Sequence, residues 1–451
     1  MDIVTEMSQL IKSSENFSEM EEKLMPLYSQ FFSATVAQCL EKLDKEIVKE
    51  YTRDGWEIDR LEERQLVFVF GTVIFKRRRI RRDGERSFMP LDRVLSIPSR
   101  QHFTSYFQEV TSQLSSKMTY RQASESISLL TQTQVSHQTV HAMTQRVGEK
   151  LLHMSEESPA SLRTPEVLFV EGDGVFVGSK EKGRHHEMKR GCLHEGVEKR
   201  GHRTILKNPV YFAVFGKSED LFKVMSSYIQ SHYDLSHSVL IANSDGGSGY
   251  EKSKFEDLCP GVKCFEYCLD AYHVMKQITI KLGFASEYQK ELGKAVKAYD
   301  KGRVEVLLDT LESQLEQEKE IEKLGELLNY LMRNWDSIKP LSMRECGVTK
   351  GVGICESGHH FFTNRLKRQG RNWTLEGVSR IAAILTSLRN GSFHRLCRME
   401  ESETLVLPEE SPIYVGSILR RSGHEAHTIP QASIPNAGST SSPIGKLAKS
   451  L

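Results

Sequence analysis

Four short runs of β-branched and aromatic residues constrain the fold of this chain most. They span residues 167–177, 210–215, 238–247 and 263–270, with helical stretches between them. Runs of this length and composition are typical of β-strands, and their alternation with helices predicts a mixed α/β sheet. The chain is 451 residues long, so it can bury a sizeable core and form roughly two to four domains.

Changes of pattern along the chain predict further regions around this sheet. A leucine stripe at helical spacing runs from 304 to 335, with acidic residues on its outer face. Beyond about residue 405 the chain is rich in Ser, Pro, Gly and Ala. We therefore expect, in order, a helical N-terminal region (1–60), a basic β-hairpin region (61–104), a helix-turn-helix domain (105–157), an α/β core in two parts (163–282 and 341–404) separated by a helical insertion (283–340), and a low-complexity tail (405–451).

A dense run of basic residues follows an apolar strand-like stretch at 65–75 and precedes the turn signal Asp83-Gly84. Between residues 76 and 86, seven basic residues stand against two acidic ones, which gives a local charge of +5. Charge runs are usually solvated, but this density favours contacts with phosphates. The residues expected to make these contacts are Lys76, Arg77, Arg78, Arg79, Arg81 and Arg82.

Two amphipathic segments, 120–130 and 135–143, predict a helix-turn-helix. The second helix of such a unit enters the major groove of DNA, and a serine stands at its expected N-cap. The residues expected at the DNA are therefore Ser136, His137, Gln138 and His141. Many helical hairpins share this pattern, so an ordinary helix pair is the alternative interpretation.

Two aspartates stand at the ends of apolar strand segments. Asp173 lies between two glycines, and Asp245 precedes Gly246-Gly247. A carboxylate in this position is poorly solvated yet open to a bulky polyanion, as a divalent cation beside a phosphate requires. Glu356, near the start of an expected helix, is the third candidate, and Glu171 shares one side of its strand with Asp173. An Asp-Gly pair after a strand is often only a turn, but two such pairs favour a metal site.

Three other clusters carry weaker signals. Cys259, Cys264 and Cys268 lack the spacing of a zinc finger, so buried free cysteines are favoured. A solvated or DNA-facing loop is expected around His185, His186, His194 and His202. A basic surface with an aromatic platform for nucleic acid is expected where Trp373 is surrounded by Arg365, Lys367, Arg368 and Arg371. A core tryptophan is the alternative there.

The whole-chain charge conceals this segregation. With 61 basic and 60 acidic residues, the net charge of +1 by itself argues against a nucleic-acid partner. However, the basic stretches at 76–86 and 365–371 are cancelled by the acidic insertion at 305–326. The chain lacks a signal peptide and an apolar run of about 18 residues, and its eight cysteines are irregularly spaced. We therefore expect a cytoplasmic, nucleoid-associated protein with no membrane partner.

Taken together, these motifs resemble those of the bacterial DDE insertion-sequence transposases of the ISLre type. The resemblance covers about residues 60–400 and rests on Glu171-Gly-Asp-Gly-Val-Phe-Val, Asn243-Ser-Asp-Gly-Gly-Ser-Gly-Tyr, Leu269-Asp-Ala-Tyr-His-Val, Cys355-Glu-Ser, Arg365-Leu-Lys and Asn372-Trp-Thr-Leu-Glu-Gly. It implies a ribonuclease-H-like catalytic core with its acidic triad on Asp173, Asp245 and Glu356. By the same analogy, Asp270 and His273 would position the scissile strand or a flipped base.

The activity implied by the resemblance is metal-dependent cleavage and strand transfer of DNA at the ends of a mobile element. The acidic triad would hold two Mg²⁺ (or Mn²⁺) ions, and the partners would be double-stranded DNA of the element ends and of the target. A homodimer or higher oligomer would be needed to bring two ends together. The alternatives are a non-catalytic DNA-binding protein derived from a transposase, and a metal-dependent phosphatase that uses Asp173.

Overall fold

The computed structural model describes residues 3–154, 159–348 and 359–399, and these divide into two compact units. The first holds the described residues up to His102 together with Thr131–Thr133, and the second holds the others. Glu356 and the predicted tail at 405–451 therefore lie outside the described residues. Each unit has its own hydrophobic core, and each is described by itself.

The first unit packs a long helix against a β-hairpin. Its elements are α1 (Ile3–Lys12), α2 (Phe17–Arg53), β1 (Glu57–Phe68), β2 (Gly71–Arg81) and α3 (Pro90–Val94). The Asn16 side chain accepts a hydrogen bond from Glu19 N and thereby caps the start of α2. Ile47 of α2 packs with Val73 and Phe75 of β2, so one face of the hairpin is buried under the helix.

The hairpin turns at a different place from the one predicted. The stretch 65–75 was expected to be one strand, but the chain reverses at residues 69–70, between β1 and β2. Gly71 has a φ of +146°, and a Cβ atom there would collide with the Ser29 hydroxyl, so the turn depends on the close approach of α2. Asp83-Gly84 turns the chain a second time, and two backbone hydrogen bonds of 3.0 and 3.2 Å join Ile80 to Phe88.

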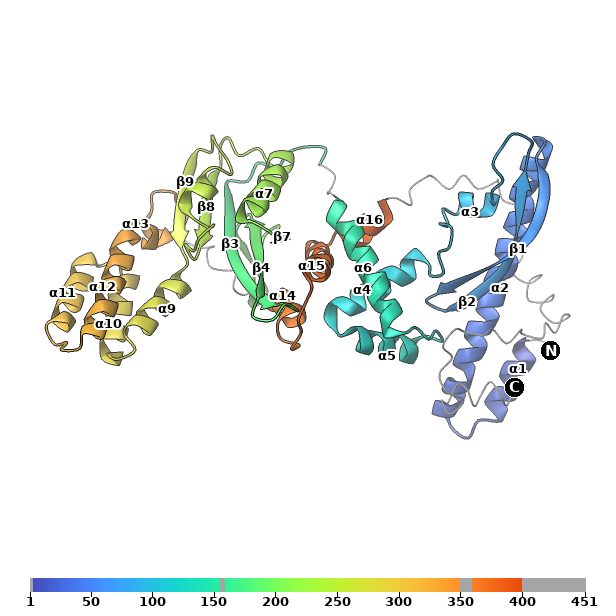
Figure 1. Ribbon diagram of the computed structural model, residues 1–451, viewed down its shortest axis with the longest axis horizontal. Helices are drawn as coiled ribbons and strands as arrows, with labels where there is room; N and C mark the ends of the chain where they lie inside the picture. The colour runs from blue at the N-terminus through green and yellow to red at the C-terminus, as the bar shows by residue number, and fades with distance from the viewer. Residues whose placement is uncertain (1–2, 155–158, 349–358, 400–451) are drawn as a thin grey trace. The chain divides into compact units, whose positions relative to one another are not determined.

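The second unit is built on a mixed sheet of five strands, so the predicted mixed α/β sheet is confirmed. The strand order is β7-β4-β3-β8-β9 (Figure 1). The antiparallel strands are β3 (Val167–Gly178), β4 (His185–His194) and β7 (Val210–Phe215), and the strands parallel to β3 are β8 (Val239–Ser244) and β9 (Cys264–Leu269). A separate ribbon pairs β5 (Val197–Arg200) with β6 (Arg203–Leu206).

Helices pack on both faces of this sheet. On one face, Leu168 and Val170 of β3 contact α7 (Ser218–His232) and α8 (Lys252–Glu256). On the other face, Val175 and Val177 of the same strand pack with the helices α6 (His137–His153), α14 (His359–Leu366), α15 (Leu375–Asn390) and α16 (Phe393–Arg398). Two more helices, α4 (Ser105–Lys117) and α5 (Tyr120–Leu130), pack against α6. The sheet is therefore buried on both sides along β3.

A group of helices follows β9 and forms a third core. Its members are α9 (Ala271–Lys281), α10 (Ser286–Lys297), α11 (Lys301–Glu312), α12 (Glu318–Arg333) and α13 (Trp335–Ile338), and the short 3₁₀ turn η1 (Leu341–Met343) ends it. Val304, Leu308, Leu324 and Leu331 are among its buried residues. The leucine stripe seen in the sequence is thus the core of this helical group.

Strand β4 contradicts one expectation. Its histidines were expected in a solvated or DNA-facing loop, but β4 lies between β3 and β7 inside the sheet. His194 is fully buried and its ring stacks on Phe169, with the ring centroids 4.7 Å apart. A strand with neighbours on both edges and helices on both faces buries its polar residues as well as its apolar ones, which hides it from hydrophobic pattern analysis.

Candidate functional site

Two aspartates meet at the carboxyl end of the parallel strands. Strands β3 and β8 pair in parallel, with Glu171 opposite Asn243 and Gly172 opposite Ser244. Asp173 and Asp245 follow at the next position of the two neighbouring strands. Because successive side chains alternate between the faces of a sheet, both carboxylates belong to the face on which Asn243 and Glu171 lie.

A third carboxylate continues this row on β9. Ser244 pairs with Leu269, and the backbone N–H of Asp270 donates to Ser244 O over 2.8 Å. Asp270 therefore takes the register position next to Asp245. The two strand-end aspartates predicted from the sequence are thus joined by one that the sequence analysis had placed in a different role.

Glycines fix the two aspartates and explain the local sequence. The N–H of Gly174 donates to Asp173 Oδ1 over 2.7 Å, and the N–H of Gly247 donates to Asp245 Oδ1 over 2.9 Å. A Cβ at Gly172 would lie 2.9 Å from carbon atoms of Tyr250 and Phe255, so only glycine lets these rings pack against β3. The Tyr250 hydroxyl in turn donates to the backbone O of Asp173 over 2.7 Å.

The electrostatics of this edge are negative. His273 Nδ1 lies 2.8 Å from Asp270 Oδ2, and this hydrogen bond raises the pKa of His273 against the opposing effect of burial. The charges of Asp245 and Asp173 act in the same direction. Burial, with a contribution from Asp245, raises the pKa of Tyr330 on α12 to about 12. A cation at this edge is therefore favoured, and His273 is held toward its charged form.

Glu171 is less suited to bind a ligand than Asp173. Its side chain is 1 % exposed, and its Oε1 lies 3.7 Å from Nε2 of the buried His194. Asp173 is only half-buried. This difference in access favours Asp173, as expected from the sequence.

The third predicted ligand, Glu356, lies outside the described residues, and α14 begins three residues after it. Within residues 3–154, 159–348 and 359–399, no group of three or more His, Cys, Asp or Glu side chains is arranged to hold a metal ion. The cysteines near β9 are inward-facing: Cys259 and Cys268 are buried, and burial raises the pKa of the Cys268 thiol to about 11. This agrees with the interpretation as buried free cysteines.

The arginines of the basic hairpin have carboxylate neighbours. Arg77 is buried and forms an ion pair with Asp92, so its position does not support a contact with phosphate. Arg78 lies 2.6 Å from Asp44, and Arg79 lies 3.1 Å from Glu62. Further ion pairs join Arg81 to Glu57 and Arg82 to Glu85. The side chains that remain exposed are those of Lys76, Arg81 and Arg82.

The predicted helix pair forms α5 and α6. Ser136 caps α6 and accepts a hydrogen bond from Thr139 N over 3.2 Å. His137, Gln138 and His141 are exposed on the first turns of α6. The residues expected to face DNA are therefore accessible, and Ser136 also has a structural role.

The basic stretch after α14 divides into buried and exposed residues. Arg365 is 1 % exposed, and its Nε donates to Ser115 O of α4 over 2.6 Å. Its guanidinium lies 4.9 Å from the Trp373 ring centroid and 5.3 Å from that of Tyr120, and burial lowers its pKa to about 10. Arg365 and Trp373 thus belong to the core, as the alternative interpretation had it. Lys367 and Arg368 are exposed, and Arg371 is half-buried.

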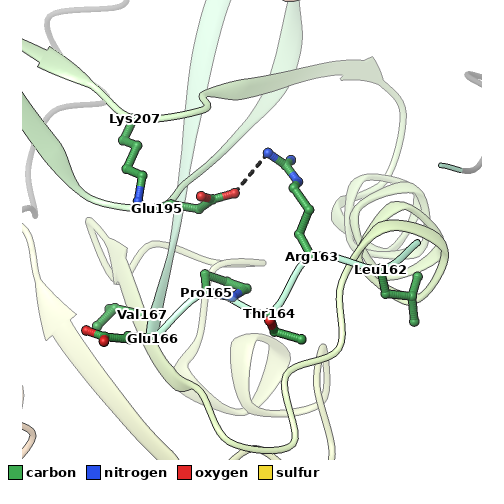
Figure 2. A pocket seen from close by; sticks show the side chains of 8 residues that line it. All are labelled: Leu162, Arg163, Thr164, Pro165, Glu166, Val167, Glu195 and Lys207. Atoms are coloured by element: carbon green, nitrogen blue, oxygen red, sulfur yellow. Dashed lines mark ion pairs between the residues drawn. The ribbon is translucent and has the colours of Figure 1, made fainter. Parts of the chain in front are cut away.

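A pocket lies at the other end of β3 (Figure 2). An ion pair of 2.9 Å joins Arg163 to Glu195 in its wall, and Arg163 also donates to the Tyr233 hydroxyl over 2.6 Å. Its wall consists of Leu162, Arg163, Thr164, Pro165, Glu166, Val167, Glu195 and Lys207. Because Arg163 is already satisfied there and Val167 begins β3, this pocket is separate from the acidic edge.

The fold and the acidic edge define an α/β protein with a row of carboxylates at the ends of parallel strands. The chain belongs to UPF0236, an uncharacterised protein family, whose model matches residues 10–403. It is 50 % identical over 449 residues to the "UPF0236 protein in vanSb 3'region" of Streptococcus gallolyticus, with all of both chains covered. It is 25 % identical over 397 residues to a UPF0236 protein of Caldanaerobacter subterraneus subsp. tengcongensis, covering 86 % of this chain and 81 % of the relative.

These findings correct the resemblance drawn from the sequence. The family is UPF0236 and not the ISLre type, and none of the relatives named here carries a transposase or DDE name. The motifs quoted for the resemblance were short Asp-Gly and Gly-rich turns, which recur wherever a strand ends in a tight loop. The names of two Caldanaerobacter relatives join several locus labels, four in one and eleven in the other. Among the described residues, no helix is long and apolar enough to span a bilayer.

Proposed function

We propose that this protein is an enzyme that cleaves DNA and transfers DNA strands by metal-dependent phosphodiester chemistry, as a transposase does. The observation that carries the proposal is the register of Asp173 and Asp245, side by side at the carboxyl ends of two parallel strands. Ligands of open α/β sheets bind at this end of the strands. Glu356 is proposed as the third carboxylate, since α14 follows it closely in the chain.

We infer that the five-stranded sheet is a ribonuclease-H-like core. Three antiparallel strands followed by two parallel ones, with helices on both faces, support this inference. The helices α9 to α13 would then be an insertion between the second and third acidic residues. Asp173 and Asp245 lie 72 positions apart in the sequence, whereas Asp245 and Glu356 lie 111 apart, and the helical group accounts for the longer separation.

The donor set at the acidic edge fits hard divalent cations. Carboxylate oxygens are the ligands that Mg²⁺ prefers, and these two side chains are half-buried with their rotamers set by Gly174 and Gly247. Two bound Mg²⁺ or Mn²⁺ ions would supply an activated water and neutralise charge on the phosphate. The chain's part is to hold Asp173 and Asp245 in place and to present His273 as a cation toward the phosphate.

DNA is proposed as the substrate because the chain offers exposed groups that suit it. His137, Gln138 and His141 on α6 would read bases in the major groove, while Lys367 and Arg368 would contact phosphates. The repeated locus labels of the Caldanaerobacter relatives agree with a gene that multiplies within a genome. Two DNA ends must be held together for strand transfer, so we also propose a homodimer or higher oligomer that works in the cytoplasm at the nucleoid.

The test is cleavage of labelled DNA fragments that flank the reading frame, with Mg²⁺, Mn²⁺ or EDTA. Asp173→Asn, Asp245→Asn and Glu356→Gln should each abolish cleavage, because each removes a metal ligand, but should leave binding to the same fragments intact. Asp300→Asn is the matched control: Asp300 caps α11 through Arg303 N, and asparagine caps equally well. Wild-type cleavage by any of the first three variants would refute the assignment of that residue. Binding without cleavage by the wild type would favour a non-catalytic DNA-binding protein.

A further inference from the structure

We propose that Arg190 on β4 is a positioning residue that acts as the built-in counter-ion of Asp173. The inference rests on the function proposed above and deepens it, because it assigns a residue that controls how the acidic edge takes up a cation. In the antiparallel pairing of β3 with β4, Asp173 and Arg190 are direct partners. Directly paired residues point to the same face of a sheet and lie about 5 Å apart at their Cα atoms, within reach of an arginine side chain.

The burial of Arg190 requires a counter-charge. Its residue is 2 % exposed, and a buried guanidinium is costly unless a carboxylate and hydrogen bonds compensate for the lost water. Neighbouring residues of β4 show that burial of a cation is not general there: Lys189 points to the opposite face and lies 2.6 Å from Glu187. The carboxylate that the register offers to Arg190 is that of Asp173.

Arg190 also reaches the helix that follows Glu356. Its guanidinium lies 5.6 Å from the ring centroid of Phe362 on α14. Phe362 is itself buried in the core that joins α14 to Val175 and Val177 of β3. Arg190 therefore lies between the strand that carries one proposed metal ligand and the helix next to another, which is the place for a group that orients both.

A guanidinium and a metal ion that neutralise the same carboxylate oppose each other. Loss of Arg190 should therefore destabilise the metal-free protein and, at the same time, increase the stabilisation that a divalent cation provides. A residue that only fills space would lower the stability equally with and without the cation. This difference separates a positioning role from a packing role.

The experiment compares melting temperatures of the full chain in EDTA and across a Mn²⁺ titration. We expect Arg190→Met to melt lower than wild type in EDTA, to show a larger Mn²⁺-induced rise, and to bind Mn²⁺ at least about threefold more tightly. Arg190→Lys keeps the charge and should resemble the wild type. The control Arg344→Met removes another arginine in an ion pair, 2.6 Å from Glu266, and should melt lower with an unchanged Mn²⁺-induced rise. An equal Mn²⁺-induced rise in wild type and Arg190→Met overturns the proposal.

Two further measurements keep the test decisive. If Arg190→Met does not fold, Arg190→Gln replaces it, because glutamine keeps hydrogen-bonding atoms but not the charge. If Mn²⁺ does not stabilise even the wild type, the proposed metal site fails, and the pair is then tested in EDTA by a double-mutant cycle of Asp173→Asn and Arg190→Gln. Losses that do not add show the pair is real, whereas additive losses overturn it.

Discussion

Replacing Gly172 by alanine tests whether the packing behind Asp173 is as tight as the structure indicates. The new Cβ would lie 2.9 Å from Phe255 Cζ and 2.9 Å from Tyr250 Cδ1, so both rings must move. Overpacking of a core costs about 1–3 kcal/mol. Displacing Tyr250 also strains its 2.7 Å hydrogen bond to Asp173 O, worth about 1 kcal/mol. The backbone at this position is ordinary, so the whole effect comes from the added methyl group.

The expected loss is therefore about 2–4 kcal/mol, which should lower the melting temperature by at least about 4 °C. Differential scanning fluorimetry of the full chain in EDTA measures it. Gly325→Ala on α12 is the matched control: its Cβ would meet no atom within 4 Å, and alanine in a helix should stabilise by about 0.5–1 kcal/mol. If Gly172→Ala melts at or above the wild type, the close packing of Tyr250 and Phe255 on β3 is wrong.

Two other predictions concern charge. The pKa of His273 is raised in the folded protein above its ordinary 6.5, so its stabilising effect is present below the unfolded pKa and is lost as the pH rises through the folded one. His273→Gln should therefore cost more stability at about pH 6 than at about pH 9 in EDTA, and an equal cost at both would contradict the hydrogen bond to Asp270. Replacing Lys76, Arg81 and Arg82 by glutamine should lower the slope of log affinity for DNA against log salt by about 0.9 for each phosphate that these side chains neutralise. Arg77→Gln should leave that slope unchanged but destabilise the first unit, and the reverse pattern would show that the buried ion pair is misplaced.

The sequence was sufficient for the elements that announce themselves by apolar pattern. Strands β3, β8 and β9 are continuous apolar runs, so the two strand-end aspartates could be predicted to lie at one edge. Strand β4 could not, because its residues include Lys189, Arg190 and His194, and it is a strand only because β3 and β7 pair with it on both edges. The register that makes Arg190 a partner of Asp173 is likewise a property of the pairing and not of the local sequence.

The turn of the basic hairpin and the ion pairs of its arginines show the same limit. Residues 69–70 are Val-Phe, which carry no turn signal, and the turn is held instead by Ser29 of α2, whose hydroxyl donates to Phe70 O over 2.6 Å. The run of arginines suggested an open basic surface, but Asp44 and Asp92, distant in sequence, neutralise Arg78 and Arg77. Charge density along the chain therefore overstates the charge that the folded surface presents.

The contact of Arg365 with α4 has a mechanical consequence. Ser115 is in the last turn of α4, where the backbone carbonyls carry the negative end of the helix dipole, and Arg365 of α14 donates to one of them from inside the core. Pulling the two helices apart would expose an aromatic-stacked guanidinium on one side and uncapped carbonyls on the other. Helices α4 and α14 therefore move as one lever, and a displacement that begins at α5 or α6 reaches the start of α14 as a rigid rotation.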